Sequence, residues 1–226
     1  MKKILLAFMV LGLILTSCNK EELSKQNKVY TDYELFYNQN ENKTHVVARF
    51  RIGGSTGTLL ELADTSGASV AFNGDLLPYD VWYGGHHKEY AGQLAGGTFV
   101  YTNTHGVMYS KVVPTGEAIA FPTDFNTIAK DMTENLVWEG TELTVNQGVG
   151  VFIGSWAWSE EAAFWTDDVG AKKIKMSVSK KSDLPLGSST VYMDRTTEID
   201  VAEGTPKGGR IRYKYRCTNV EVEIIN

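Results

Sequence analysis

A glycine-rich segment comes nearest to a catalytic motif. Residues 53–57 match the pattern G-x-S-x-G, in which a serine on a strained turn between a strand and a helix acts as a hydrolase nucleophile. Residues 58–62 then read Thr-Leu-Leu-Glu-Leu, a strand pattern, and a chain with 22 glycines produces such matches by chance. Residues 148–154 hold further glycines, but no helix start follows them to bind a phosphate. We therefore expect turns here and no enzyme, with a hydrolase on a β scaffold as a remote alternative.

Histidines and paired acids carry other possible chemistries, but their spacing argues against them. His86 and His87 are neighbours, and neighbouring strand residues point to opposite faces, so the two imidazoles are not expected to share a metal ion. Glu160-Glu161 and Asp167-Asp168 are adjacent acids, whereas glycosidase carboxylates stand about 5–9 Å apart across a cleft. Solvated loop acids or weak calcium ligands are the alternatives. The sequence predicts no catalytic residue, no metal site and no cofactor.

Aromatic side chains gather in two segments and offer a binding surface. One lies between Asn73-Gly74 and Thr98, and the other covers residues 156–165. Exposed rings stack on sugars or on protein side chains, and connecting loops often carry such sites. Packing in the core is the alternative for each ring. The predicted ligand-binding residues are Tyr79, Trp82, Tyr83, Trp156, Trp158 and Trp165.

A basic ladder near the C-terminus could bind an anionic polymer. It consists of Arg210, Arg212, Lys214 and Arg216. A tight turn at Thr218-Asn219 would set Glu221 and Glu223 opposite two of these side chains and neutralise the face. The formal net charge of the chain is −5, and nucleic acid requires a basic surface, so we exclude nucleic acid as a partner.

The N-terminus predicts a lipid anchor. Lys2 and Lys3 precede an uncharged apolar run over residues 4–15, which is shorter than the ~20 residues of a membrane-spanning helix. Leu15-Thr16-Ser17-Cys18 resembles the lipobox of bacterial lipoproteins. The resemblance implies that residues 1–17 are a lipoprotein signal peptide, that Cys18 carries the lipid and that residues 18–28 are a polar tether. An ordinary secretory signal or a buried apolar helix is the alternative.

A second resemblance concerns the destination of the protein. Asn19-Lys20-Glu21-Glu22 resembles the lipoprotein export signal of Bacteroidetes-type bacteria, a lysine followed by two acids behind the lipidated cysteine. It implies a lipid-anchored protein of the cell outer membrane that faces outward. The alternative is that residues 19–28 are only a solvated tether without an export signal. If Cys18 is lipidated, Cys217 has no intramolecular disulfide partner, since the chain has two cysteines.

The remaining residues predict strands that alternate in polarity. Hydrophobic residues make up 42% and charged residues 22% of the 226, a globular balance, and the many glycines and aromatic residues favour strands and turns. In residues 45–52, Val46, Ala48 and Phe50 face the core and His45 and Arg49 face away. Residues 124–133 are predicted as one short helix. The predicted strands are residues 29–37, 45–52, 58–62, 70–72, 98–104, 107–113, 118–121, 136–138, 141–145, 149–156, 172–178, 190–194, 197–201, 210–217 and 220–224.

A turn at Pro114-Thr115-Gly116 divides these strands into residues 29–114 and 115–226. The first part, with Ala48-Arg49-Phe50-Arg51 and a hairpin around His105-Gly106, resembles the immunoglobulin-like domains that occur in pairs on surface lipoproteins of Bacteroidetes-type bacteria. The second part, which contains Gly208-Gly209-Arg210-Ile211-Arg212, is similar to the partner domain. The resemblance implies an all-β fold of two tandem immunoglobulin-like β-sandwiches.

Paired sandwiches on a lipid tether resemble the surface glycan-binding lipoproteins of polysaccharide-uptake systems. We therefore expect a non-catalytic, lipid-anchored cell-surface protein for binding or adhesion. Its partners are expected to be the membrane, through Cys18, and a glycan or an envelope protein. The alternative is a structural spacer or assembly subunit of an envelope complex.

Overall fold

The computed structural model describes residues 29–62, 67–154, 162–201 and 208–226. The predicted signal peptide, the tether with Cys18, and the predicted ligands Trp156 and Trp158 lie outside these residues. The described chain is nearly all β, as expected, and its sheets pack in a sandwich-like arrangement. In the described residues, the helical segment is α1 (Val178–Lys181). No helix in this part of the chain is long and apolar enough to cross a bilayer.

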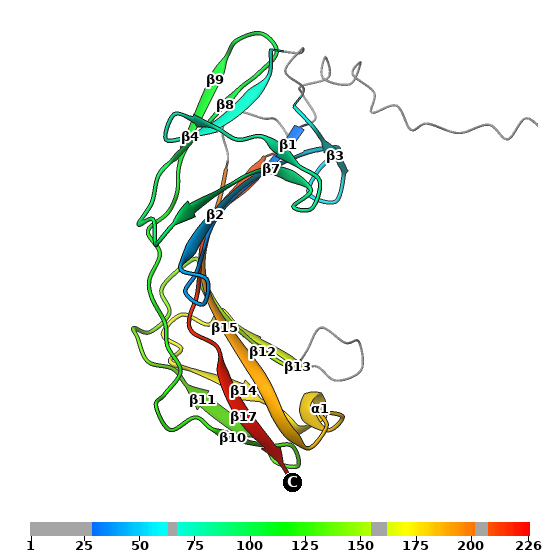
Figure 1. The fold of residues 1–226 in the computed structure, drawn as a ribbon, viewed down its shortest axis with the longest axis vertical. Coiled ribbons are helices and arrows are strands. Elements are labelled where there is room, and N and C mark those ends of the chain that lie inside the picture. Colours follow the sequence, from blue (N-terminus) through cyan, green and yellow to red (C-terminus); the bar gives the residue numbers. More distant parts are fainter. Residues whose placement is uncertain (1–28, 63–66, 155–161, 202–207) are drawn as a thin grey trace, which may run out of the picture.

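The largest sheet has 11 strands and follows the crescent shape of the molecule (Figure 1). Eight strands pair in the order β10-β17-β15-β16-β1-β2-β7-β6, β12 joins β15 to β13, and β3 pairs with β2. Their bounds are β1 Val29–Asn38, β2 Lys43–Ile52, β3 Thr58–Leu60, β6 Tyr79–Asp80, β7 Gly85–Ala91, β10 Thr127–Ala129, β12 Gln147–Ile153, β13 Ala162–Thr166, β15 Gly187–Asp200, β16 Gly209–Arg216 and β17 Val220–Ile225.

Two smaller sheets pack on one face of the large sheet. A four-stranded sheet has the order β5-β4-β8-β9, and a two-stranded sheet pairs β11 with β14. Near β8, the ring of Tyr33 lies 4.8 Å from that of Phe99, and the ring of Phe50 lies 4.8 Å from that of Tyr101. The bounds are β4 Ser69–Phe72, β5 Asp75–Leu76, β8 Thr98–Thr102, β9 Met108–Val112, β11 Glu134–Val137 and β14 Lys173–Met176.

Alternation sets the two faces of the large sheet. In β1, Tyr33, Leu35 and Tyr37 point into the core, while the intervening Glu34 and Phe36 point to the other face. The expected inward face of β2 is confirmed, because Val46, Ala48 and Phe50 are all fully buried. The second face of the sheet is therefore the one available for polar and functional side chains.

The predicted helix over residues 124–133 is wrong. Residues 127–129 form β10, which runs parallel to β17, and Ile128 pairs with Ile224. The four-residue spacing of Ile128 and Met132 suggested a helix, but Met132 is exposed. Burial of Ile128 against a neighbouring strand outweighs a helical signal that short.

The predicted strands at residues 190–194 and 197–201 are one continuous strand, β15. Arg195, between the two predicted strands, points to the same face as the buried Val191 and Met193. Arg195 is fully buried, and its guanidinium donates hydrogen bonds to the Thr141 carbonyl at 3.1 Å and the Gln147 Oε1 at 2.6 Å. The Glu117 carboxylate, 3.1 Å from Nη2, compensates the charge, and the strand continues through Arg195.

The basic ladder on β16 is neutralised, but not by the acids that the sequence suggested. β16 lies between β1 and β15 and does not pair with β17, so Glu221 and Glu223 do not face it. Arg210 contacts Asp32 at 3.0 Å, Arg212 contacts Glu34 at 2.5 Å, and Arg216 contacts Asp194 at 2.7 Å. Acids of both neighbouring strands thus compensate the positive charge.

The division at residues 114 and 115 and the immunoglobulin-like topology stay predictions. The observed pairing crosses that division, since β1 runs parallel to β16 from Thr31 beside Gly209 to Asn38 beside Arg216. The buried hydrophobic residues also form one cluster that draws on both parts. Both predicted parts therefore contribute to a single large sheet.

Candidate functional site

The predicted aromatic ligands that the structure describes lie at opposite ends of the large sheet. Tyr79, Trp82 and Tyr83 belong to β6 and the turn before β7, whereas Trp165 belongs to β13. Strands β12, β15, β16, β1 and β2 separate the two ends. Trp82 is 96% exposed and Trp165 is 57% exposed, while Tyr79 and Tyr83 are partly buried. The aromatic residues therefore do not form one site.

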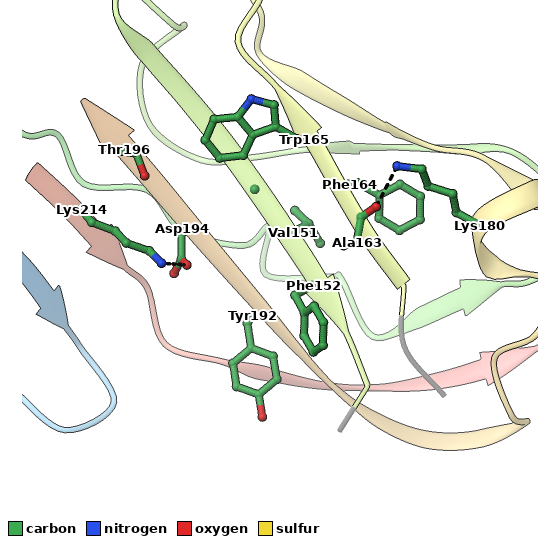
Figure 2. A pocket seen from close by; sticks show the side chains of 11 residues that line it. Val151, Phe152, Ala163, Phe164, Trp165, Lys180, Tyr192, Asp194, Thr196 and Lys214 are labelled. Carbon is green, nitrogen blue, oxygen red and sulfur yellow. Dashed lines mark hydrogen bonds and ion pairs between the residues drawn. The ribbon is translucent and has the colours of Figure 1, made fainter. Parts of the chain in front are cut away.

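Trp165 borders a cavity of about 420 Å³ (Figure 2). Phe152, Tyr192, Asp194, Thr196 and Lys214 also line it. Strand register explains this grouping, because Trp165 pairs with Gly150, Gly150 with Asp194, and Thr196 with Lys214. The full lining is Gly150, Val151, Phe152, Ala163, Phe164, Trp165, Lys180, Tyr192, Asp194, Thr196 and Lys214.

Two glycines of β12 leave the space that the Trp165 ring occupies. A Cβ atom on Gly148 would come within 2.2 Å of the indole, and one on Gly150 within 3.0 Å. The indole therefore lies against the bare backbone of β12 (Figure 2). Trp165 is 57% exposed, which leaves the side of the ring away from β12 open to solvent. Glycines in a strand often mark such a close approach. The sequence pattern does not indicate this role of Gly148 and Gly150, because it depends on the pairing of β12 with β13.

The cavity combines aromatic rings with a charged polar wall. The rings of Phe152 and Tyr192 lie 5.9 Å apart. Asp194 accepts hydrogen bonds from Lys214 at 2.7 Å and from Arg216 at 2.7 and 2.8 Å. Burial opposes the charge of Asp194, but the hydrogen bonds and charges of Arg216 and Lys214 outweigh it and hold the pKa of the carboxyl below its usual value. Asp194 is therefore a fixed carboxylate that accepts hydrogen bonds.

The candidate nucleophiles do not lie in this cavity. Ser55 of the G-x-S-x-G match is exposed in a turn, and β3 follows it, which confirms the expected strand. Cys217 is a buried free thiol, and burial raises its pKa to about 12, which keeps it protonated near neutral pH.

The two adjacent histidines point to opposite faces of the sheet, as expected. His86 points into the core, where its Nε2 accepts the Leu62 N–H at 3.1 Å. His87 points to the other face, where its Nε2 lies 3.3 Å from Nδ1 of His45 on β2. The positions of His86 and His87 in the chain do not indicate this contact, because it depends on the pairing of β2 with β7.

The sequence matches no protein-family model and no curated protein.

Proposed function

We propose that this chain is a non-catalytic binding protein, held at the outer membrane by a lipid on Cys18, and that its ligand is a carbohydrate. The observation that carries the proposal is the open face of Trp165, fixed flat over two glycines beside a polar cavity. The lipid anchor and the surface address rest on the sequence resemblances of residues 15–22. The surface glycan-binding lipoproteins that the chain resembles would share this role.

The cavity suits a sugar because a sugar has two kinds of surface. Its C–H face packs on an indole, and its hydroxyl groups require directed hydrogen-bond partners. Trp165 supplies the ring, and Asp194, Thr196 and Lys214 line the adjoining wall. A cavity of about 420 Å³ matches the range of about 300–1,000 Å³ that small-molecule sites occupy. One or two sugar residues of a longer chain would fill it.

The charges in the cavity support binding over hydrolysis. Asp194 is the one carboxylate among the described lining residues, and glycoside hydrolysis commonly uses a pair of carboxylates. The ion pairs with Lys214 and Arg216 further favour a permanently ionised Asp194, which cannot act as a general acid at neutral pH.

The experiment is a glycan array followed by titration calorimetry with the best oligosaccharide. Trp165→Ala should weaken binding at least about tenfold, or about 1.4 kcal/mol. Trp82→Ala is the matched control, since it removes an exposed tryptophan at the other end of the sheet, and it should leave the affinity unchanged. Both variants should melt near the temperature of the unaltered protein. Equal affinity of Trp165→Ala and the unaltered protein would reject this site.

One observation favours the alternative of an assembly subunit. Val81 and Trp82 are 80% and 96% exposed at the turn between β6 and β7. Aromatic residues are enriched at protein interfaces, so this tip suits an envelope protein as partner. Loss of partner capture in Trp82→Ala, with no glycan effect in Trp165→Ala, would favour this second function.

A further inference from the structure

Strands β2 and β7 bring two histidines and a glutamate together on one face. His45 pairs directly with Glu89 across the strands, and His87 pairs with Val47, two residues further along. The three side chains therefore share the face of the sheet that points away from the core. Their ligand atoms, one from each residue, all lie within 4.8 Å of one another.

We propose that His45, His87 and Glu89 bind a divalent transition-metal ion, with zinc as the best-fitting ion. The site lies at the opposite end of the large sheet from Trp165 and is independent of the proposed carbohydrate site. Two imidazoles and one carboxylate are a donor set that zinc accepts, with one coordination position left for water or another ligand.

The separation of the donor atoms fits a tetrahedral ion. His45 Nδ1 lies 3.3 Å from His87 Nε2 and 3.8 Å from Glu89 Oε1. Two nitrogens bound to zinc at about 2.0–2.1 Å with a tetrahedral angle stand ~3.3 Å apart. The imidazoles therefore already have the required spacing, and the Glu89 carboxylate, within 4.8 Å of both nitrogens, must move toward them to complete the site.

The outer nitrogens of both rings face carboxylates. His45 Nε2 lies 3.2 Å from Glu41 Oε2, and His87 Nδ1 lies 3.5 Å from Asp80 Oδ2. A ring N–H that faces a carboxylate leaves the lone pair of a neutral imidazole on its inner nitrogen. With both rings in this tautomer, His45 Nδ1 and His87 Nε2 each offer a lone pair on the side where they meet, and a cation can bind there. Carboxylates behind histidine ligands are also typical of metal sites.

The surroundings hold these ligands in place. His45 and His87 are 5% and 7% exposed, and the ring of Tyr83 stacks on His87 at 3.5 Å. The Tyr83 hydroxyl lies 3.1 Å from His45 Nδ1, where it can donate a hydrogen bond until an ion takes that lone pair. Lys43 binds Glu89 Oε2 at 2.7 Å and leaves Oε1 for the ion. The Glu89 side chain is 42% exposed, which gives an ion access from solvent.

The experiment is calorimetric titration of the metal-free chain, purified without a histidine tag, with zinc chloride. The unaltered protein should bind one zinc ion. His87→Gln and Glu89→Gln should each weaken binding at least tenfold, and Asp80→Asn, which removes the carboxylate behind His87, about tenfold or more. His105→Gln is the matched control because His105 is exposed in the β8–β9 turn, and it should bind zinc normally.

A second measurement covers variants that fold poorly. Zinc should raise the melting temperature of the unaltered protein and of His105→Gln, but not that of His87→Gln, because a ligand stabilises the state that binds it. Cobalt added in place of zinc should give the visible absorption of a tetrahedral ion. The proposal is overturned if the unaltered protein binds zinc no more tightly than His87→Gln does, or if neither metal produces these changes.

Discussion

Gly148→Ala tests the seat of Trp165 without removing the ring. The new Cβ would lie 2.2 Å from the indole, whereas carbon atoms in contact keep about 3.5 Å, so the ring must shift by roughly 1.3 Å. The backbone of Gly148 has no positive φ, so alanine fits it without strain. We expect carbohydrate affinity to fall about tenfold or more, because stacking depends on the position of the ring face.

The free energy of unfolding should change much less in this variant. Trp165 is already 57% exposed, so displacing its ring uncovers little further surface. Alanine in place of glycine inside a strand also adds roughly 0.5–1 kcal/mol of stability. We expect a net change within about 1 kcal/mol, measured by urea denaturation, while calorimetry with the array-selected oligosaccharide reports the affinity.

Gly96→Ala is the matched control for Gly148→Ala. A Cβ on Gly96 meets no atom within 4 Å, and its backbone has no positive φ either. This variant should keep both affinity and stability. Unchanged affinity in Gly148→Ala, or an equal loss in both variants, would refute the reasoning.

Two further predictions concern Asp194 and Cys18. The folded-state pKa of Asp194 is depressed, so its contribution to stability is present above the unfolded pKa near 4 and is lost as the pH falls through the folded value. Asp194→Asn should therefore be at least ~1.5 kcal/mol less stable than the unaltered protein at pH 7, with the difference shrinking below pH ~4 in urea titrations; a constant difference would contradict this. Cys18→Ala should move the protein from the membrane to the soluble envelope fraction and abolish fatty-acid labelling, and a variant that still sediments with membranes would exclude the anchor.

Local patterns predicted the strand faces well, because burial depends on alternation along one strand. Ile174 and Met176 of β14, and Ile211 and Tyr213 of β16, are buried at alternating positions, as expected for the strands predicted there. Asn73-Gly74 is a residue pair typical of tight turns, and both residues have positive φ. These features depend on neighbours within a few residues.

Pairing between distant strands could not be predicted in the same way. The sequence pattern placed the acids opposite β16 on the next strand along the chain. In the structure, Asp32 comes from β1 and Asp194 from β15. The candidate site shows the same limit, because Trp165 was found from its type, while the role of Gly148 requires the pairing of β12 with β13. The His45–His87 contact likewise requires the register of β2 and β7.

The parallel pairing of β1 with β16 has a consequence for the order of folding. Asp32 and Arg210, which hydrogen-bond across these strands, are 178 residues apart in the chain. β1 therefore has one partner, β2, early in synthesis, but lacks its second partner, β16, until residues 209–216 are available. Closing so long a loop is slow because its entropy is lost before the contact is gained. If residues 1–17 are a signal peptide, the chain crosses the membrane with its N-terminus first. The large sheet then stays incomplete until β16 has crossed the membrane.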